Sequence, residues 1–350
     1  MPTVSCEKLE DLAFRIFCAA GAPGEHSHVV ARHLADCNRA GHDSHGFIRV
    51  IQYIRQIREG LIVPAAKPSV ISDSPALAQV DGNRGFGQVA ATFATEMAVE
   101  KAKKQGVGCV TVRRLGHLGR LGAYGEMAAN SGCAAILFCS TGGQGISVAP
   151  YGGSRRKLAT NPIAIAFPGE EQTILSDFAT SVAAEGKIRV YRARGDKLPD
   201  GWIYDPAGRP STNPNDFYDG GAILPVGGSV GHKGYCLSFM TDLLGGILSR
   251  DGLAAIPGPQ FSNGSLILVI DLERFAPLLQ IRSEASRMVN YIKDTPLAEG
   301  FRTILYPGEK EAKNREERNR NGVTIEEDTW TQVLALAREY GLSDTSDSTS

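Results

Sequence analysis

The stretch Gly85-Phe86-Gly87-Gln88-Val89-Ala90 decides between two kinds of α/β fold. It matches the G-x-G-x-x-A pattern of dinucleotide-binding turns, follows a strand predicted for residues 76–80 and opens a helix predicted for 88–104. That pattern also requires an acidic residue about 20 residues further on, which binds ribose hydroxyls. Here the next predicted strand, 108–112, leads into Arg113-Arg114. Two interpretations follow: a phosphate-binding turn whose arginines suit a 2′-phosphate, or a turn before a packed helix. We favour the second.

Predicted helices and strands are mixed on both sides of this stretch. Apolar residues at helical spacing predict helices over 9–20, 26–40 and 47–59, so the chain is expected to begin with a helical region. Further along, short apolar runs predict strands 134–140, 163–167, 173–177 and 265–271, and longer runs predict helices 122–131 and 235–248. This mixture predicts an α/β (α+β) fold.

Two C-terminal stretches are expected to stay outside the core. Charges of both signs crowd together from residue 309 to 320, which indicates a solvated helix face rather than a binding patch. Residues 343–350 contain only small and acidic side chains with nothing to bury, and they are predicted to be disordered.

The composition excludes several classes of partner. With 350 residues, the chain is long enough for about two domains that bury a hydrophobic core. Its formal net charge of -1 provides no basic field for nucleic acid or an anionic membrane. Without a signal-like start or an apolar run of about 18 residues, we expect a cytoplasmic protein. The seven cysteines form no C-x-x-C pair and are expected to be free buried thiols with no bound metal.

The stretch Gly41-His42-Asp43-Ser44-His45-Gly46-Phe47-Ile48-Arg49 is the densest group of chemically active side chains. Histidine titrates near neutral pH and suits proton transfer to a reacting carbonyl, and arginine forms a two-pronged pair with a carboxylate. If a helix starts near Gly46, His45 and Arg49 share one of its faces. In the alternative interpretation, Asp43 or Ser44 caps the helix and Arg49 pairs on the surface. The spacing leaves both open.

Four further segments place polar residues beside glycines or at predicted element ends. The glycine-rich segment 116–122 contains His117 and connects a strand to a helix, where backbone N–H groups can hold phosphate oxygens. Residues 160–162 precede a strand, residues 177–181 follow one, and Lys233 precedes the apolar helix. Each of these segments has an equally simple structural explanation as a connection.

Taken together, these segments resemble the malate/L-lactate dehydrogenase family of the non-Rossmann type, which includes hydroxyacid dehydrogenases and cyclic ketimine reductases. The form G-H-x-G-R at 116–120, with F-G-Q-V-A-A, is most similar to the hydroxycarboxylate dehydrogenase B branch. The matching segments occur in family order and are GHDSHG (41–46) with Arg49, GFGQVAA (85–91), GHLGRLGAYGE (116–126), TNPIAIAFP (160–168), DFATSVAAEGKIRV (177–190), GHKGY (231–235) and LYPGE (305–309).

The resemblance implies an architecture and an assembly. A helical region built from residues 1–72 and 282–342 would stand on the substrate side of an α/β core of residues 73–281, with a mixed sheet unlike the Rossmann fold. The tail 343–350 would lie outside both. Members of the family are usually homodimers.

The resemblance also implies an activity, the transfer of a hydride between NAD or NADP and a small 2-hydroxy or 2-oxo acid. It gives catalytic positions to Ser44, His45 and Lys187 and substrate-binding positions to Arg49 and Thr160. The implied cofactor-binding residues are His117, Leu118, Gly119, Asp177, Phe178, Ala179, Lys233, Pro307, Gly308 and Glu309.

Three alternatives differ from this expectation. A cyclic ketimine reductase on the same scaffold would place a carboxylate where this chain has Glu185-Gly186-Lys187, and lysine is typical of the hydroxyacid branches. A non-catalytic metabolite binder would not need the set of Ser44, His45 and Arg49. A metal hydrolase built on residues 42–45 lacks a known ligand spacing.

Overall fold

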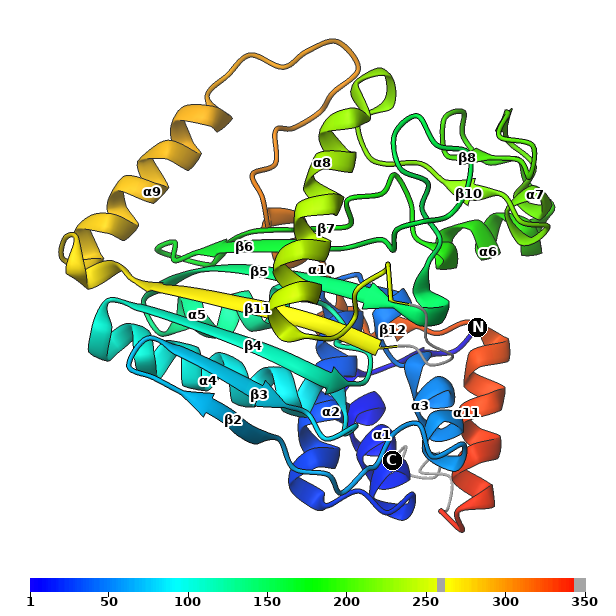
Figure 1. The fold of residues 1–350 in the computed structure, drawn as a ribbon, viewed down its shortest axis with the longest axis horizontal. Helices are drawn as coiled ribbons and strands as arrows, with labels where there is room; N and C mark the ends of the chain where they lie inside the picture. The colour runs from blue at the N-terminus through cyan, green and yellow to red at the C-terminus, as the bar shows by residue number, and fades with distance from the viewer. Residues whose placement is uncertain (257–261, 343–350) are drawn as a thin grey trace.

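A seven-stranded mixed sheet forms the centre of the structure (Figure 1). The computed structural model describes residues 1–256 and 262–342, so the predicted tail lies outside the described residues. Strands β3 and β4 are parallel, and the other neighbouring pairs of this sheet are antiparallel. In sheet order the strands are β2 (Ser69–Asp73), β3 (Leu77–Asp81), β4 (Val107–Leu115), β11 (Ser262–Asp271), β5 (Cys133–Gly142), β6 (Ile163–Phe167) and β7 (Ile174–Phe178).

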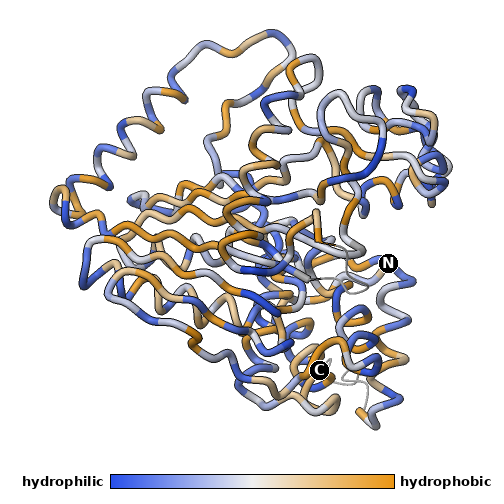
Figure 2. The backbone as a smooth tube through the Cα atoms, viewed as in Figure 1, coloured by the Kyte–Doolittle hydropathy of each residue, from blue (hydrophilic) through white to orange (hydrophobic). Residues whose placement is uncertain are grey.

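The sheet is covered by helices on both faces. Helices α4 (Gly87–Gln105) and α5 (Gly122–Asn130) cover one face, and α8 (His232–Thr241) with the following π-helical turn Asp242–Ile247 covers the other. The face of α4 toward the sheet is a row of buried alanines, which lets the helix approach closely. Figure 2 accordingly shows hydrophobic residues running along the central strands.

A helical region packs at one end of the sheet and is built from both ends of the chain. Pairing of β1 (Thr3–Val4) with β12 (Val323–Thr324) brings the two ends together. Phe17, Val50 and Val333, from three of the helices, belong to one buried cluster. The helices are α1 (Cys6–Ala19), α2 (Gly24–Arg39), α3 (Arg49–Arg58), α10 (Glu309–Asn321) and α11 (Glu327–Glu339).

Two other parts of the chain stand away from this region. A small lobe contains the sheet β10-β8-β9 and two helices, and its core includes Ile188, Ile203 and Phe217. Its elements are α6 (Glu185–Arg194), β8 (Ile203–Tyr204), β9 (Pro210–Ser211), α7 (Pro214–Tyr218) and β10 (Ala222–Ile223). Helix α9 (Leu278–Lys293) straddles the expected boundary at residue 282, buries no residue and projects from the far side of the sheet (Figure 1).

The predicted elements are confirmed with small shifts at their ends, and two expectations are wrong in part. Cys236 is exposed, and Cys18 and Cys109 are partly exposed, so the seven free thiols are not all buried. The charged segment 309–320 does form a helix, but its face toward α2 and α5 is engaged in ion pairs rather than solvated. In the described part of the chain no helix has the length and apolarity to cross a membrane.

Candidate active site

Two histidines from distant parts of the sequence stack at the junction of the helical region and the core. The ring centroids of His45 and His117 lie 5.4 Å apart, with 17° between the ring planes. His45 ends the short 3-10 helix Asp43–His45, and His117 lies in the loop between β4 and α5. The hydroxyl oxygen of Ser44 lies 3.1 Å from Nδ1 of His45. The structure therefore joins two motifs that the sequence shows only separately.

Arg49 lies on the same side of α3 as this histidine pair. Its Nε donates to the backbone carbonyl of Ser44 at 2.7 Å, and its Nη1 donates to Gln52. Asp43 instead pairs with Arg318 at 2.6 Å, and α3 begins without a side-chain cap. The helix-cap interpretation of residues 43–49 is therefore wrong, because the side chains that would form the cap have other partners.

Burial keeps both imidazoles uncharged. Burial, reinforced by the positive charge of Arg49, lowers the pKa of His45 to about 3. Burial and the same arginine hold the pKa of His117 well below its usual value. The charged groups that shift these two pKa values are cationic, so they oppose a positive charge on either ring. His45 is ready to accept a proton at neutral pH.

The glycine-rich stretch 85–90 supports the loop that carries His117. The amide of Gly116 donates to the Gly85 carbonyl at 3.2 Å. A Cβ at position 87 would lie 2.4 Å from the carbonyl oxygen of Gly116 and 2.5 Å from that of His117. The start of α4 is therefore covered by protein backbone, which confirms the interpretation as a turn before a packed helix and leaves no place for a pyrophosphate.

Arg113 and Arg114 have a carboxylate as their partner rather than a phosphate. Both guanidinium groups pair with Asp81 at the end of β3, at 3.1 Å and 3.5 Å. The two arginines of β4 thus bind the carboxylate at the end of β3. The dinucleotide interpretation would have required them to bind a phosphate instead.

Tyr53 and Gln88 complete the surroundings of His117, and the sequence analysis did not identify them. Tyr53 Oη lies 2.8 Å from Nδ1 of His117, and Gln88 Nε2 donates to Tyr53 Oη at 2.7 Å. Both side chains are buried. Gln88 lies inside the glycine-rich stretch, so its position next to G-x-G was the one available signal.

The start of α6 lies beside Ser44. A Cβ at Gly186 would lie 3.8 Å from the Ser44 Cβ, which places the segment Glu185-Gly186-Lys187 at the edge of the site. The carboxylate of Glu185 accepts a hydrogen bond from Tyr218 at 2.8 Å. Lys187 is exposed on the first turn of α6. The structure therefore brings the backbone of this segment to the site, and its catalytic lysine stays a prediction.

Thr160 lies in a strained turn that leads into β6. The next residue, Asn161, has a positive φ of 38° although it is not glycine. Its Nδ2 donates to the carbonyl and the hydroxyl of Ser238 on α8, at 3.1 and 3.2 Å. Thr180 donates to the Thr160 carbonyl at 3.1 Å. These contacts hold the Thr160 backbone in one conformation, as a substrate contact would require.

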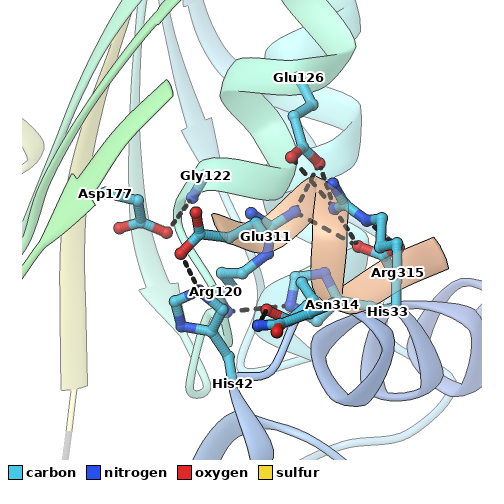
Figure 3. A network of polar contacts seen from close by, with 11 residues as sticks. His33, His42, Arg120, Gly122, Glu126, Asp177, Glu311, Asn314 and Arg315 are labelled. Atoms are coloured by element: carbon cyan, nitrogen blue, oxygen red, sulfur yellow. Dashed lines mark hydrogen bonds and ion pairs between the residues drawn. The ribbon is translucent and has the colours of Figure 1, made fainter. Parts of the chain in front are cut away.

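The three segments expected to bind cofactor are connected through β7, and Figure 3 shows the contact between Asp177 and Gly122. The carboxylate of Asp177 accepts a hydrogen bond from the amide of Gly122 at 2.7 Å, which joins the segments 117–119 and 177–179. The amide of Leu175 donates to the Pro307 carbonyl at 3.1 Å, which joins 307–309 to the same strand. Phe178 is exposed at this end, and Gly119 and Gly308 have positive φ.

Two of the expected cofactor residues differ from the others: Glu309 has other contacts, and Lys233 lies on another face of the sheet. The carboxylate of Glu309 is bound by Lys293 and Lys313, each at 2.8 Å. Although burial opposes it, these lysines lower the pKa of Glu309 to about 2. Lys233 is exposed on the first turn of α8, on the other face of the sheet from α5. For Glu309 the geometry indicates a fixed, permanently charged anchor of the turn.

An ion-pair network centres on Arg120, one of the charges that act on His45, and Figure 3 shows part of this network. We use this name for Asp36, Arg120, Glu126 and Arg315, which come from α2, the loop before α5, α5 and α10. Arg120 is 2% exposed and pairs with Asp36 at 3.3 Å and with Glu126. Its Nε and Nη1 have no hydrogen-bond partner within the described residues.

Two further histidines, His33 and His42, have partners near this network. The amide of Arg120 donates to Nε2 of His33 at 3.1 Å, and burial lowers the pKa of that ring to about 4. Nε2 of His42 lies 3.3 Å from Glu311. Because His42 and Asp43 turn to different partners, they do not converge with His45. Across residues 1–256 and 262–342 no three His, Cys, Asp or Glu side chains are placed to hold a metal ion.

Comparison with known proteins gives the same family along nearly the whole chain. The family profile described as malate/L-lactate dehydrogenase matches residues 4–334. A malate dehydrogenase of Pyrococcus abyssi is 35% identical over 96% of this chain and 94% of its own length. Hydroxycarboxylate dehydrogenase B of Escherichia coli is 33% identical over 93% of this chain and 91% of its own.

Solved structures agree. The crystal structure of a malate dehydrogenase from Entamoeba histolytica superimposes with a TM-score of 0.94 at 30% identity and covers 98% of this chain and 99% of its own. A Δ1-piperideine-2-carboxylate reductase from Pseudomonas syringae superimposes with a TM-score of 0.83 at 30% identity, over 96% of this chain and 100% of its own.

The chain belongs to the malate/L-lactate dehydrogenase family. It is an oxidoreductase of hydroxy acids, and its mixed sheet is the fold of that family. The fold and the class of reaction expected from the sequence are thus confirmed.

Proposed function

We propose that His45 moves the proton and Arg49 holds the carboxylate while a hydride passes between a nicotinamide cofactor and a small 2-hydroxy or 2-oxo acid. The observation that carries this proposal is the stacked, neutral histidine pair beside the partly exposed guanidinium of Arg49. A hydroxy acid needs a base for its hydroxyl proton and a cation for its carboxylate, and this site offers one of each.

The state of His45 fits the oxidation of a hydroxy acid directly. A neutral imidazole whose ring proton is on Nδ1, where it is donated to the Ser44 oxygen, can accept the hydroxyl proton at Nε2. In the reverse direction the same imidazolium returns the proton to the carbonyl oxygen. Because Arg49 lowers the pKa of His45, a bound carboxylate that neutralises Arg49 raises it again. Substrate binding thus helps the proton transfer.

Arg49 is held in position before any substrate arrives. Its Nε is fixed on the Ser44 carbonyl, one residue from His45, so the cation and the base share one backbone segment. Burial lowers the pKa of the guanidinium more than the nearby charge of Glu185 raises it, as expected of a charge that is only partly compensated within the described residues. We propose that the carboxylate of the acid supplies that counterion, with Thr160 as a further contact and Lys187 at the edge of the site.

The residues present fit a nicotinamide dinucleotide. The segments 117–119, 177–179 and 307–309 are connected through β7, and Arg120, next to Gly119, keeps buried N–H donors without an acceptor among the described residues. When bound, the nicotinamide supplies or takes up the hydride. We propose that these segments and Lys233 hold the cofactor, NAD or NADP.

A cyclic ketimine reductase is the second candidate, because one structural relative carries that name. Against it, the carboxylate of Glu185 is bound to Tyr218, and the position that would complete a relay with Ser44 is Lys187. A hydroxy or oxo acid is therefore the better substrate class for this site.

We further propose a cytoplasmic homodimer, with a helical region formed by residues 1–72 and 282–342. Large apolar side chains are exposed on α8 and α9, among them Phe239, Met240, Leu279 and Tyr291. Exposed apolar faces on a projecting helix are typical of an interface between subunits.

The proposal is tested by following the absorbance of NADH, and then of NADPH, against pyruvate, oxaloacetate, 2-oxoglutarate, an aryl pyruvate and one cyclic ketimine. We expect oxidation of one cofactor with at least one oxo acid. Turnover of the ketimine alone would contradict the proposal and identify a cyclic ketimine reductase, the second candidate. Cofactor binding without turnover of any compound would contradict the proposed roles of His45 and Arg49.

A further inference from the structure

A chain of three side chains ends on the ring of His117. Gln88 lies in the first turn of α4, and its Nε2 donates to Tyr53 Oη at 2.7 Å. Tyr53 Oη lies 2.8 Å from Nδ1 of His117. Gln88 and Tyr53 are each 1% exposed, so water does not compete for these hydrogen bonds.

The direction of the first hydrogen bond fixes that of the second. A tyrosine hydroxyl has one proton to donate and accepts through its oxygen. Because the Gln88 amide donates to this oxygen, the hydroxyl proton is left for the ring of His117. Burial raises the pKa of Tyr53, so the hydroxyl keeps its proton at neutral pH.

We infer that Gln88 and Tyr53 are positioning residues that hold His117 in the tautomer with its proton on Nε2. Tyr53 donates to Nδ1, and a neutral imidazole carries only one ring proton. This inference rests on the proposed function, since it concerns the histidine that stacks on the proposed proton carrier.

The tautomer matters because two neutral imidazoles stand side by side. With Nδ1 occupied and Nε2 protonated, His117 has no lone pair with which to compete with His45 for the hydroxyl proton of the acid. The stretch Gly85–Gln88 thus positions His117 in two ways. Gly87 packs against its backbone, and Gln88 acts on its ring through Tyr53.

The tautomer can be measured on the ligand-free protein with histidine labelled with ¹⁵N and ¹³C. The ring nitrogens of His117 are observed by NMR and identified by their absence from His117→Asn. We expect one tautomer, protonated on Nε2, in the unsubstituted protein, and a mixture in both Tyr53→Phe and Gln88→Met. A proton on Nδ1, or a tautomer that neither substitution changes, would overturn the inference.

Tyr124→Phe is a matched control. Tyr124 is also 1% exposed, and its hydroxyl donates to the carbonyl of Leu118, the residue next to His117, at 2.6 Å. Its loss removes an equally buried hydrogen bond from the same loop without touching the ring. The tautomer should stay single in this variant, and a mixture there would show that any disturbance of the loop has the same effect.

Kinetics distinguish positioning from binding. Tyr53→Phe should lower kcat for the acid about tenfold and change KM less than about twofold, because the ring remains while its proton is no longer fixed. A higher KM with an unchanged kcat would contradict the inference. The tautomer measurement needs no substrate, so its failure is separate from a failure of the proposed reaction.

Discussion

Two partly buried polar clusters lie where the helical region meets the sheet, and they differ in how far their charges are compensated. The ion-pair network pairs Arg120 and Arg315 with Asp36 and Glu126, so that each charge has a partner (Figure 3). The histidine pair has neutral rings, neutral hydrogen-bond partners and one guanidinium without a full counterion. A cluster whose charges are satisfied holds helices together, whereas a cluster that still lacks a charge is suited to a ligand.

The strongest test of this contrast is His45→Ala. Removal of the proton carrier should lower kcat by about 10²–10⁴-fold while the affinity for cofactor and the unfolding free energy stay near their original values. Steady-state kinetics and a fluorescence titration with NADH measure these quantities. His28→Ala, at an exposed histidine of α2, is the control. If kcat in His45→Ala is unchanged, the proton carrier is another group.

In the ion-pair network the same kind of deletion should affect stability first. Arg120→Met leaves Asp36 and Glu126 to share Arg315, and loss of one buried partner costs about 3 kcal/mol of unfolding free energy. Arg58→Met removes an exposed ion pair with Glu339 and should cost less than about 1 kcal/mol. Urea unfolding at neutral pH compares the two. Equal costs would mean that the network is not what holds α2, α5 and α10 together.

Arg49→Lys tests whether the missing counterion is the substrate. A lysine keeps the charge but cannot form a two-pronged pair, so KM for the acid should rise about 10–100-fold with a smaller change in kcat. The comparison is Arg55→Lys, an exposed arginine on the same helix that pairs with Glu59. A KM within about twofold of the original would place the carboxylate contact elsewhere.

The pH dependence is a smaller test of the neutral histidine pair. With a pKa of about 3 for His45, the protonated fraction falls about tenfold for each pH unit above that value. The range from about pH 5 to about pH 8 lies wholly above this pKa. In the free enzyme, kcat/KM for reduction of an oxo acid should therefore decrease steadily across it. For oxidation of the hydroxy acid, His45 is already neutral and should give no acid limb there. A break near pH 6.5, the ordinary value, would show that the pKa is not lowered.

Much of this architecture can be predicted from the local sequence. The row of alanines at 90, 94, 98 and 102 in α4 and the apolar run in β11 predicted the helix and the strand at the centre of the fold, since their burial follows from periodicity. The segment around His45 and Arg49 was also identified, but the shared helix face expected for the two side chains is wrong, because α3 begins only at Arg49 and His45 ends a separate 3-10 helix. Helix α9 was not predicted, although its apolar residues recur at helical spacing.

What tertiary structure decided is which motifs meet. The sequence by itself determined that a histidine, an arginine and several glycine-rich turns were available for the chemistry of a hydroxy acid. It could not show that His117 stacks on His45, that Gln88 reaches it through Tyr53, or that the charged helix α10 faces Asp36 and Glu126. Those contacts join residues 35 to 279 positions apart, and local periodicity carries no information about contacts over such separations. The meaning of the glycine pattern was decided in the same way, because only the path of the backbone at Gly116 shows that the start of α4 is already covered.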